Sequence, residues 1–292
     1  MGTLDDIPGA MGCNGCGERY PLLNGRPVLV PGAERGSIEA FLATEDGRKM
    51  VREYDGRGHA AEGKAQGGGL ARLKPPSVMH RYEEDLLHGR AKVLFEARGG
   101  AQPLVLNVGG GPHRVSDGEI TLNIGPFPNV DLIADGQRIP VADDTFDAVF
   151  SLAVLEHVPD APRVVSEMMR VLRPGGYLYS EVPFIWFYHG YPSDFQRYTL
   201  SGMKRLFAGL EEPQFGMTHG PVSAALQSGN MALQMLVPAR PRALRKLFNG
   251  LYRLVFFPFK YLDLRLRGHP EAHTMAGGFF VLGRKPGARP AT

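Results

Sequence analysis

The stretch that decides the fold is Leu-Val-Leu-Asn-Val-Gly-Gly-Gly, residues 104–111. An apolar run rich in valine and leucine stops abruptly at three consecutive glycines. This pattern is typical of a buried strand that ends in a turn whose backbone must approach a ligand closely. Taken alone it is a weak indication, because glycine clusters also close ordinary turns.

The residues that follow strengthen this interpretation, because similar strand endings recur along the chain. An apolar run over 119–124 carries Asn123 near its end, and another over 130–134 stops at Asp135. A fourth run, over 146–150, leads into Leu-Glu-His at 155–157, and a fifth ends at Val182. Together the runs predict a parallel sheet with one nucleotide-type ligand laid across the carboxyl ends of its strands.

Several ordered motifs resemble those of class I S-adenosylmethionine (SAM)-dependent methyltransferases of the type 11-like group. They are Asn-Val-Gly-Gly-Gly-Pro, Ile-Ala-Asp-Gly, Phe-Asp-Ala-Val-Phe-Ser, Val-Leu-Glu-His-Val and Val-Leu-Arg-Pro-Gly-Gly, spread over roughly residues 100–210. The resemblance implies an α/β fold, with a Rossmann-like seven-stranded sheet flanked by helices. It also implies SAM as methyl donor and S-adenosylhomocysteine as product.

Residues 1–34 form a separate β segment that resembles the second half of a small zinc ribbon, known from an activator of tRNA and protein methyltransferases. A closed structural zinc site needs four ligands, but this chain offers only the cysteine pair Cys13 and Cys16. We therefore expect a β-hairpin that packs without metal, and zinc is not expected. Ligands from His or Asp, or a site completed across a dimer, remain open alternatives.

The remaining chain divides into a linker and a catalytic domain. Residues 35–76 are polar and interrupted by Gly67-Gly68-Gly69 and Pro75-Pro76, which indicates a linker or mobile cover. The methyltransferase domain is expected over 77–292, beginning with a helix over 78–97. A helical insertion is expected over 222–275, before a final strand over 277–283.

Composition places the chain among globular proteins of the cytoplasm. Of its 292 residues, 43% are hydrophobic and 22% are charged. The first ten residues lack the pattern of a signal peptide, and no apolar run approaches the ~20 residues that cross a bilayer. With only two cysteines, a disulfide framework is excluded.

The resemblance also implies a cofactor site at the strand ends. The glycine turn would bring backbone N–H groups to the methionyl part of SAM, next to a helix start that favours its carboxylate. Asn123 matches the position that meets the ribose hydroxyls, and Asp135 the position that binds the adenine amino group, with Gln137 as a neighbour. The predicted cofactor residues are Asn107, Gly109, Gly110, Gly111, Asn123, Ile124, Asp135, Gly136, Ser151 and Leu152.

Two of these residues depart from the pattern of the family. Asn107 and Asn123 stand where acidic residues are common. An amide oxygen accepts a hydrogen bond without the charge-assisted strength of a carboxylate. The exchanges predict weaker or differently shaped SAM binding, and they motivate an alternative in which the chain is a SAM-binding scaffold or partner subunit without catalysis.

The loop after the fifth strand, residues 184–199, is dense in aromatic and polar side chains. Methylation of a hydroxyl requires a base, and we assign this role to His189. Asp194 could orient it, while Arg197 could bind substrate or pair with Asp194. Alternatively, Asp194 and Arg197 form a structural ion pair that caps a helix over 199–210. Trp186, Tyr188, Tyr191 and Tyr198 are the predicted substrate-binding residues.

His157 is the remaining catalytic candidate, with the alternative that it only holds its loop in place. No spacing of Asp and His suits a catalytic metal, so none is expected. The leading hypothesis is O-methylation of a sugar, a glycan intermediate or a natural product. N-methylation of a small molecule or peptide is the main enzymatic alternative.

Residues 239–267 form a basic segment near the C-terminus. They contain eight Lys or Arg and a single acidic residue, Asp263, although the whole chain has a net charge of only +3. The segment is also rich in leucine and phenylalanine, and Pro258 predicts a bend. It could fold onto the sheet, form a homodimer contact, cover a large substrate, or contact an anionic membrane. Nucleic acid is not an expected partner, since no known nucleic-acid module accompanies the charge. The hypothesis of RNA modification rests only on this segment and on the zinc-ribbon resemblance of residues 1–34.

Overall fold

The computed structural model of the chain describes residues 4–7, 10–13, 19–23, 26–29, 75–82, 103–111, 114, 118–127, 129–190, 193–238 and 240–287. Most of the linker predicted over 35–76, and most of the helix predicted over 78–97, lie outside these residues. Tyr191 and Cys16 also lie outside them.

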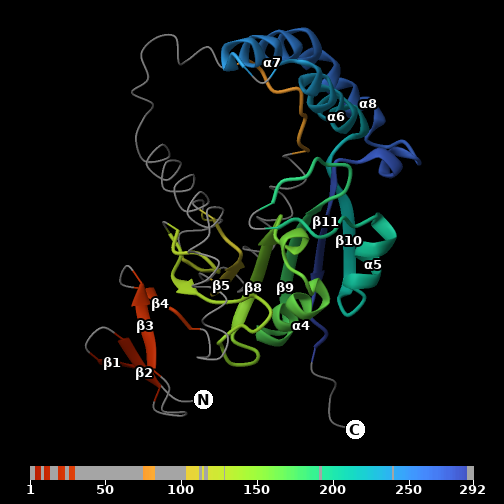
Figure 1. Ribbon diagram of the computed structural model, residues 1–292. Helices are drawn as coiled ribbons and strands as arrows, with labels where there is room; N and C mark the ends of the chain where they lie inside the picture. The colour runs from red at the N-terminus through yellow and green to blue at the C-terminus, as the bar shows by residue number, and fades with distance from the viewer. Residues whose placement is uncertain are drawn as a thin grey trace.

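A seven-stranded sheet forms the centre of the molecule (Figure 1), in the order β10-β11-β9-β8-β5-β6-β7. β11 pairs antiparallel with both of its neighbours, and all other pairs are parallel. This topology confirms the predicted Rossmann-like class I methyltransferase fold. The strands are β5 (Val105–Val108), β6 (Glu119–Asn123), β7 (Leu132–Ile133), β8 (Phe146–Leu152), β9 (Leu172–Pro183), β10 (Glu211–His219) and β11 (Gly278–Arg284).

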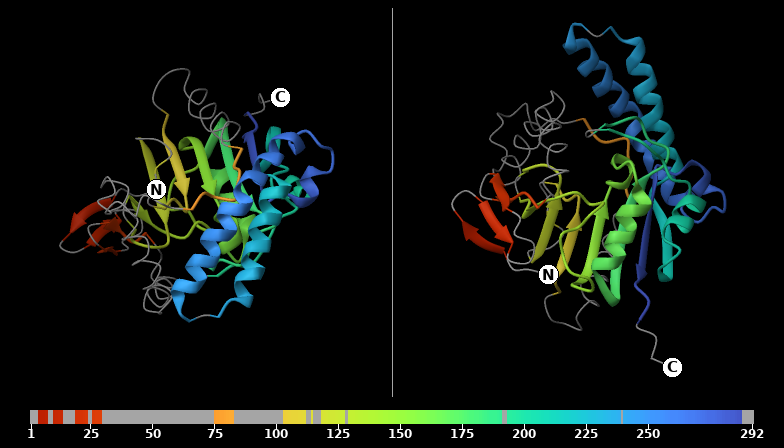
Figure 2. Two further views of the ribbon diagram at one scale, coloured as in Figure 1. Left: turned by 90° about the horizontal axis from the view of Figure 1, so that it is seen from above. Right: turned by 60° about the horizontal axis from the view of Figure 1, so that its bottom comes forward.

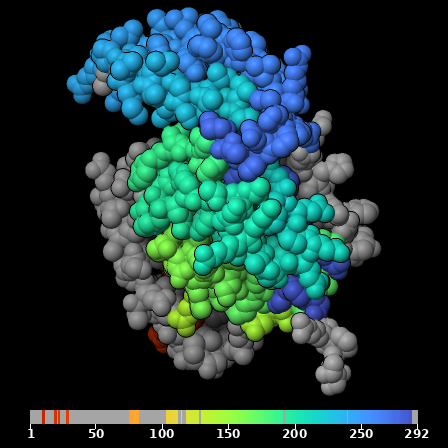
Figure 3. Space-filling view, turned by 90° about the vertical axis from the view of Figure 1, so that its right-hand side faces the viewer, coloured from red at the N-terminus to blue at the C-terminus, as the bar shows by residue number. Residues whose placement is uncertain are grey.

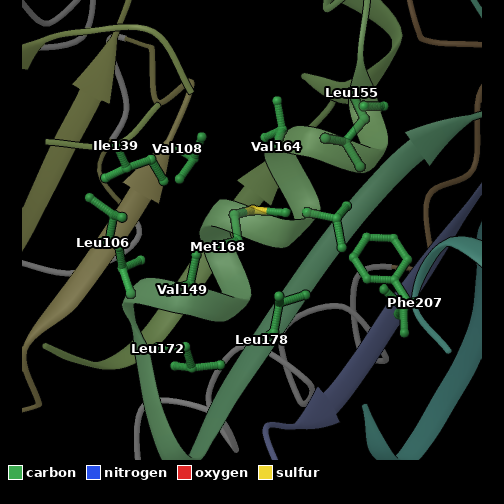
Figure 4. Close-up of a cluster of buried hydrophobic side chains, with 14 of the residues drawn as sticks. Leu106, Val108, Ile139, Val149, Leu155, Val164, Met168, Leu172, Leu178 and Phe207 are labelled. Carbon is green, nitrogen blue, oxygen red and sulfur yellow. The ribbon is translucent and has the colours of Figure 1, made fainter. Parts of the chain in front are cut away.

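Helix α4 (Ala161–Val171) covers one face of this sheet and closes the main core (Figure 4). It begins where the Asp160 side chain accepts a hydrogen bond from the Arg163 N–H, at 3.0 Å. Its apolar residues recur at helical spacing, so one face is buried against the strands. The core includes Leu106, Val108, Val149, Val164, Met168, Val171, Leu178 and Phe207.

The N-terminal segment forms its own antiparallel sheet, β1 (Leu4–Ile7), β2 (Ala10–Cys13), β3 (Arg19–Leu23) and β4 (Arg26–Pro27). Immediately after β4, Val28 pairs with Ile133 of β7, and the Leu29 N–H donates to the Ile133 carbonyl at 2.9 Å. This contact covers the edge of the central sheet, which would otherwise offer unpaired backbone groups. The predicted hairpin is present, and the expectation that it packs without zinc stays a prediction.

The opposite edge of the sheet is covered by residues 75–82, and here one expectation is wrong. A helix was expected from residue 78, but residues 78–82 are not helical. Arg81 instead forms an antiparallel bridge with His219, and the Tyr82 N–H donates to the Thr218 carbonyl at 3.2 Å. The edge of β10 offers these backbone partners, so the chain is extended at the start of the expected helix, whose remaining residues lie outside the described part.

Two shorter helical elements lie beside the carboxyl ends of the strands. The 3-10 helix η2 (Leu155–His157) follows β8, and α5 (Leu200–Leu206) lies between β9 and β10. The side chain of Thr199 accepts a hydrogen bond from the Gly202 N–H at 3.1 Å and so caps α5.

The chain between β10 and β11 forms a helical projection (Figure 2), which is the helical insertion expected in the fold. It contains α6 (Pro221–Leu236), α7 (Arg242–Phe256), η3 (Phe257–Leu262) and α8 (Asp263–Leu266), and η4 (Ala272–Met275) follows before β11. Residues 221–266 are called the arm below. Among the described residues, no helix combines the length and apolarity needed to cross a bilayer.

Candidate functional site

A cavity of about 490 Å³ opens at the carboxyl ends of β5, β6, β7 and β8. Its volume falls in the range of about 300–1,000 Å³ that is typical of small-molecule sites. Six of the predicted cofactor residues line it: Gly109, Asn123, Ile124, Asp135, Gly136 and Leu152. The candidate bases His157 and His189 line it too, so the two predicted sets of residues share one cavity.

The glycine turn lets two loops approach each other closely at the cavity floor. Gly109 has φ +72°, and a Cβ there would lie 2.4 Å from Cγ2 of Val154. A Cβ on Gly110 would lie 2.5 Å from Cγ2 of Thr121. A side chain is therefore excluded at Gly109 by the backbone conformation and by lack of space, and at Gly110 by lack of space.

Asn123 connects the turn after β5 to the turn after β6. Its side-chain amide donates to the Gly110 carbonyl at 2.9 Å, and its oxygen accepts from the Gly125 N–H at 3.0 Å. A carboxylate at this position could not donate to Gly110. The asparagine therefore has a structural role at the cavity wall.

Asp135 lies at the end of β7 and faces the same cavity. Its carboxylate accepts hydrogen bonds from the Gln137 N–H at 2.8 Å and from the Gln137 side chain at 3.1 Å. Both residues line the cavity, so they form a polar edge within a largely apolar lining.

Asn107, Gly110, Gly111 and Ser151 are not among the lining residues. Asn107 is buried in the sheet, where its amide donates to the Glu119 carboxylate at 3.0 Å. Ser151 is also fully buried. These residues lie behind the cavity wall.

The catalytic candidates meet around a carboxylate that sequence reasoning did not select. Glu156, in η2, is fully buried, and among the described residues its two carboxylate oxygens have no hydrogen-bond partner. The His189 Nε2 lies 3.5 Å from Glu156 Oε1, and the His157 Nε2 lies 3.7 Å from the same oxygen. The two imidazole rings meet edge to face at 4.9 Å.

Hydrogen bonds on the far sides of the rings orient both histidines. The His157 Nδ1 lies 2.6 Å from the Ser193 carbonyl, and the His189 Nδ1 lies 3.1 Å from the Phe187 carbonyl. A carbonyl oxygen only accepts, so each Nδ1 carries a proton. When the rings are neutral, both Nε2 atoms are acceptors and face an acceptor carboxylate. This arrangement calls for a cation or a shared proton at its centre.

The proton affinity of His189 reflects this arrangement. The nearby Glu156 carboxylate raises the pKa of His189 above the ordinary 6.5, and the Phe187 carbonyl and the charge of Asp194 act in the same direction. Burial opposes them by lowering the pKa. His189 is thus biased towards the protonated form.

Asp194 and Arg197 form a bidentate ion pair beside His189. Arg197 donates to both carboxylate oxygens of Asp194 and to the Phe187 carbonyl at 3.0 Å. This pair is the main reason that the pKa of Asp194 falls to about 2. The Asp194 carboxylate also accepts from the backbone N–H of His189 at 2.9 Å. The pair therefore orders the loop around His189, whereas Thr199 caps α5.

The loop after β9 folds back over η2 through three hydrogen bonds to backbone carbonyls. The Phe195 N–H donates to the Glu156 carbonyl at 2.8 Å, and the Gln196 side chain donates to the carbonyls of Leu155 and Val158. These bonds bring residues 189 and 156 together although more than thirty positions separate them. Short-range sequence patterns cannot reveal such a contact.

Of the predicted substrate residues, Trp186, Tyr188 and Tyr198 lie outside the cavity lining, and Tyr191 is not among the described residues. Tyr188 is 73% exposed, and Tyr198 packs against the core. Trp186 stacks on Phe187, with ring centroids 5.1 Å apart. Two other aromatic residues, Phe127 and Phe195, do line the cavity and were missed.

Among the residues that the structure describes, the set Glu156, His157 and His189 also has the chemistry of a metal site. Their potential ligand atoms all lie within 4.8 Å of one another. The expectation that no metal is bound stays a prediction.

Comparison with known proteins finds a family resemblance in the central sheet. The methyltransferase domain family matches residues 122–180, the stretch that contains Asn123, Asp135 and Glu156. Over this stretch the chain is similar to methyltransferase domains. The similarity agrees with the strand order of the sheet and with the cavity at its carboxyl edge.

Three curated relatives resemble parts of this chain. Methyltransferase GfsG of Streptomyces halstedii is 48% identical over 46 residues, which is 16% of each chain. The C-methyltransferase UbiE of Bartonella henselae, named for ubiquinone and menaquinone biosynthesis, is 30% identical over 37% of this chain and 43% of its own. The 27-O-demethylrifamycin SV methyltransferase of Amycolatopsis mediterranei is 47% identical over 15% of this chain and 16% of its own. The matches thus cover less than half of each relative.

Proposed function

We propose that this chain transfers the methyl group of SAM to a hydroxyl of a small molecule, such as a sugar, a glycan intermediate or a natural product. The carrying observation is the pairing of His189, which lines the cavity at the sheet edge, with the buried carboxylate of Glu156. His189 acts as the general base, and Glu156 stabilises the imidazolium that forms.

The cavity residues suit SAM in three respects. The glycine turn lines the cavity with backbone at Gly109, where a methionyl group can approach the main chain closely. Asp135 and Gln137 offer the acceptor and donor groups that an adenine edge requires. The volume of about 490 Å³ is sufficient for a nucleoside with an amino-acid tail. When bound, SAM supplies an electrophilic methyl group on a sulfonium.

The protein contributes alignment and a proton acceptor. An alcohol is a weak nucleophile until its proton is removed, and an imidazole with a pKa near the working pH removes it efficiently. The His189 Nε2 faces the buried carboxylate because its Nδ1 is held by the Phe187 carbonyl. The Asp194–Arg197 pair positions the backbone around this ring.

A hydroxyl acceptor is favoured because this base would be unnecessary for most amines. A neutral amine attacks without prior loss of a proton, so an N-methyltransferase gains little from a charged His–Glu pair. The name of the rifamycin relative specifies an O-methyl product and that of UbiE a C-methyl product. The choice of acceptor atom therefore rests on His189 and Glu156.

The test is incubation of the full chain with methyl-labelled SAM and fractions of small molecules, glycans and RNA. We expect label in a small-molecule or glycan fraction, in an alkali-stable ether. His189→Ala should lower kcat/KM by about 10²–10⁴-fold while S-adenosylhomocysteine binding is retained. Full activity of this variant, or label on nitrogen, would overturn the assignment of a base and a hydroxyl acceptor.

Chelation separates a proton from a metal at the same residues. With a proton at the Glu156–His189 pair, protein treated with a chelator keeps its activity. Loss of activity that added zinc or manganese restores would instead assign these side chains to a metal and overturn the base mechanism.

A SAM-binding scaffold without catalysis is the second candidate, favoured by Asn123. Its amide is engaged on both sides by Gly110 and Gly125, and it lacks the charge of a carboxylate. Such a protein would bind S-adenosylhomocysteine and label no fraction. Its His189→Ala variant would behave as the wild type in both measurements.

A further inference from the structure

The arm reverses the usual distribution of polar and apolar side chains. Between α6 and α7 the contacts are polar: Asn230 donates to Asn249 at 2.9 Å, and Arg245 donates to the Gln234 carbonyl at 3.1 Å. Tyr252 is buried in the same interface and donates to the Leu226 carbonyl at 2.9 Å. The pair of helices is therefore joined by hydrogen bonds.

The large apolar side chains of α7 face outward instead. Leu247 is 60% exposed and Leu254 is 58% exposed. The outward residues recur at positions i, i+3, i+7, i+10 and i+11, which places them in one row along the helix. The row consists of Leu244, Leu247, Leu251, Leu254 and Val255.

Exposed apolar side chains continue beyond this row, at both ends of α7. Met235 and Leu236 are exposed at the end of α6, and Phe259, Tyr261 and Leu264 are exposed in η3 and α8. So many exposed large apolar side chains in one region are uncommon on the surface of a protein that acts alone. Figure 3 shows the arm as a ridge that overhangs the rest of the molecule.

Every exposed charge on the arm is positive. Its only acidic residue, Asp263, is fully buried and accepts hydrogen bonds from the N–H groups of Val222 and Ser223, at 2.8 and 3.0 Å. Arg242, Lys246 and Arg253 recur at i, i+4 and i+11 on the face of α7 opposite the apolar row.

Four cations also gather at the far end of the arm. A hollow of about 650 Å³ is lined by Arg240, Arg242, Arg245 and Lys246, and its described lining contains no carboxylate. Such a group attracts anions such as phosphate groups. The arm thus contains a helix with one apolar face and one cationic face, and a cationic hollow lies at its far end.

We infer that the arm docks on the surface of an anionic lipid bilayer. The apolar row of α7 would enter the boundary between headgroups and acyl chains, and the cations would meet lipid phosphates. A second copy paired through the apolar rows would leave the cations on the opposite face and in the hollow without anions, so it fits less well. This inference is independent of the proposed methyl transfer.

The test is co-sedimentation of the full chain with vesicles that contain phosphatidylglycerol and phosphatidylcholine, or phosphatidylcholine alone. We expect strong binding to the anionic vesicles and weak binding to the neutral ones. Leu247→Glu with Leu251→Glu should lower the partition coefficient by about a hundredfold. Met275→Glu, which changes an exposed apolar residue outside the arm, should leave binding unchanged.

Charge is tested separately from apolar contact. Arg242→Gln and Lys246→Gln should each lower binding to anionic vesicles about fivefold, and high salt should act in the same direction. Equal recovery with and without vesicles would overturn the inference. So would a dimer in light scattering that the Leu247→Glu, Leu251→Glu variant abolishes, since the apolar row would then belong to a homodimer.

Discussion

The cavity and the arm both reverse the ordinary placement of side chains, in opposite directions. The cavity buries a carboxylate, Glu156, without a protein hydrogen bond, whereas the arm exposes a row of leucines and buries amides such as Asn230. Each arrangement costs free energy unless a further group compensates for it. At the cavity we assign this role to a proton shared with His189, and at the arm to a lipid surface.

The comparison teaches that local chemistry, rather than burial alone, indicates function here. Asp194 is also buried beside His189, but Arg197 satisfies it completely. Glu156 lies one residue from the cavity wall and remains without a donor. Two carboxylates within reach of one histidine therefore have different roles, one structural and one electrostatic.

The largest effect is expected from a substitution in the glycine turn. Gly110→Val would place its Cβ about where the Thr121 and Asn107 side chains lie, 2.5 and 2.7 Å away. We expect S-adenosylhomocysteine binding to weaken at least about a hundredfold, measured by calorimetry. The matched control is Gly268→Val, because no atom lies within 4 Å of a Cβ at that position. Unchanged binding in a folded Gly110→Val protein would move the cofactor elsewhere.

Glu156→Gln tests the electrostatic role of the buried carboxylate. The Glu156 carboxylate is the main cause that raises the pKa of His189, so its removal should lower that pKa. The rising limb of kcat/KM against pH should move to lower pH, and the plateau should fall about tenfold because the base is weaker. The exposed Glu271→Gln serves as control.

A pH profile that is identical in Glu156→Gln and the wild type would contradict this coupling. A plateau lowered without any shift of the limb would assign Glu156 to structure alone. The two results are distinguishable because the pKa and the maximum rate are read from one titration.

Asp194→Asn tests the structural carboxylate and should act mainly on stability. Loss of the pair with Arg197 should lower the free energy of unfolding near pH 7 by about 1–3 kcal/mol, measured by urea denaturation. Because the folded pKa of Asp194 is about 2, against an ordinary 3.8, its contribution is present above 3.8 and is lost as pH falls towards 2. The difference from wild type should therefore shrink in acid, and a constant difference would refute the linkage.

The smallest effect is expected between the arm helices. Asn230→Leu alone leaves Asn249 without its donor and should lower stability by about 1 kcal/mol. The double variant with Asn249→Leu should recover part of this loss, because Asn249 no longer lacks its donor, although Gln234 loses both of its side-chain acceptors. Thermal unfolding of the two variants measures the difference, and equal losses would mean that the polar interface does not hold the arm together.

Much of the fold could be predicted from sequence because its signals are local. The apolar run before Gly109 and the strand endings at Asn123 and Asp135 each lie within a few residues, and parallel strands bring them to one edge. The segment from residue 78 shows the opposite case. The backbone of residues 81 and 82 pairs with His219 and Thr218 of β10, far along the chain, so the expected helix does not begin at residue 78.

The site could be predicted only in part for the same reason. His189 was found through its aromatic loop, but its partner Glu156 depends on the fold-back contacts of Phe195 and Gln196. The arm was recognised as basic and apolar, yet which face is exposed depends on the amides that join α6 and α7. Tertiary contacts between distant residues decide both questions.

The central claim is that a SAM-type ligand binds where the glycine turn and Asp135 meet at the sheet edge. Calorimetric titration of the full chain with S-adenosylhomocysteine tests it most directly, with Asp135→Ala compared in parallel. We predict one site per chain and affinity at least about tenfold weaker in the variant. Absence of binding to the wild type, or equal affinity in Asp135→Ala, would contradict the claim.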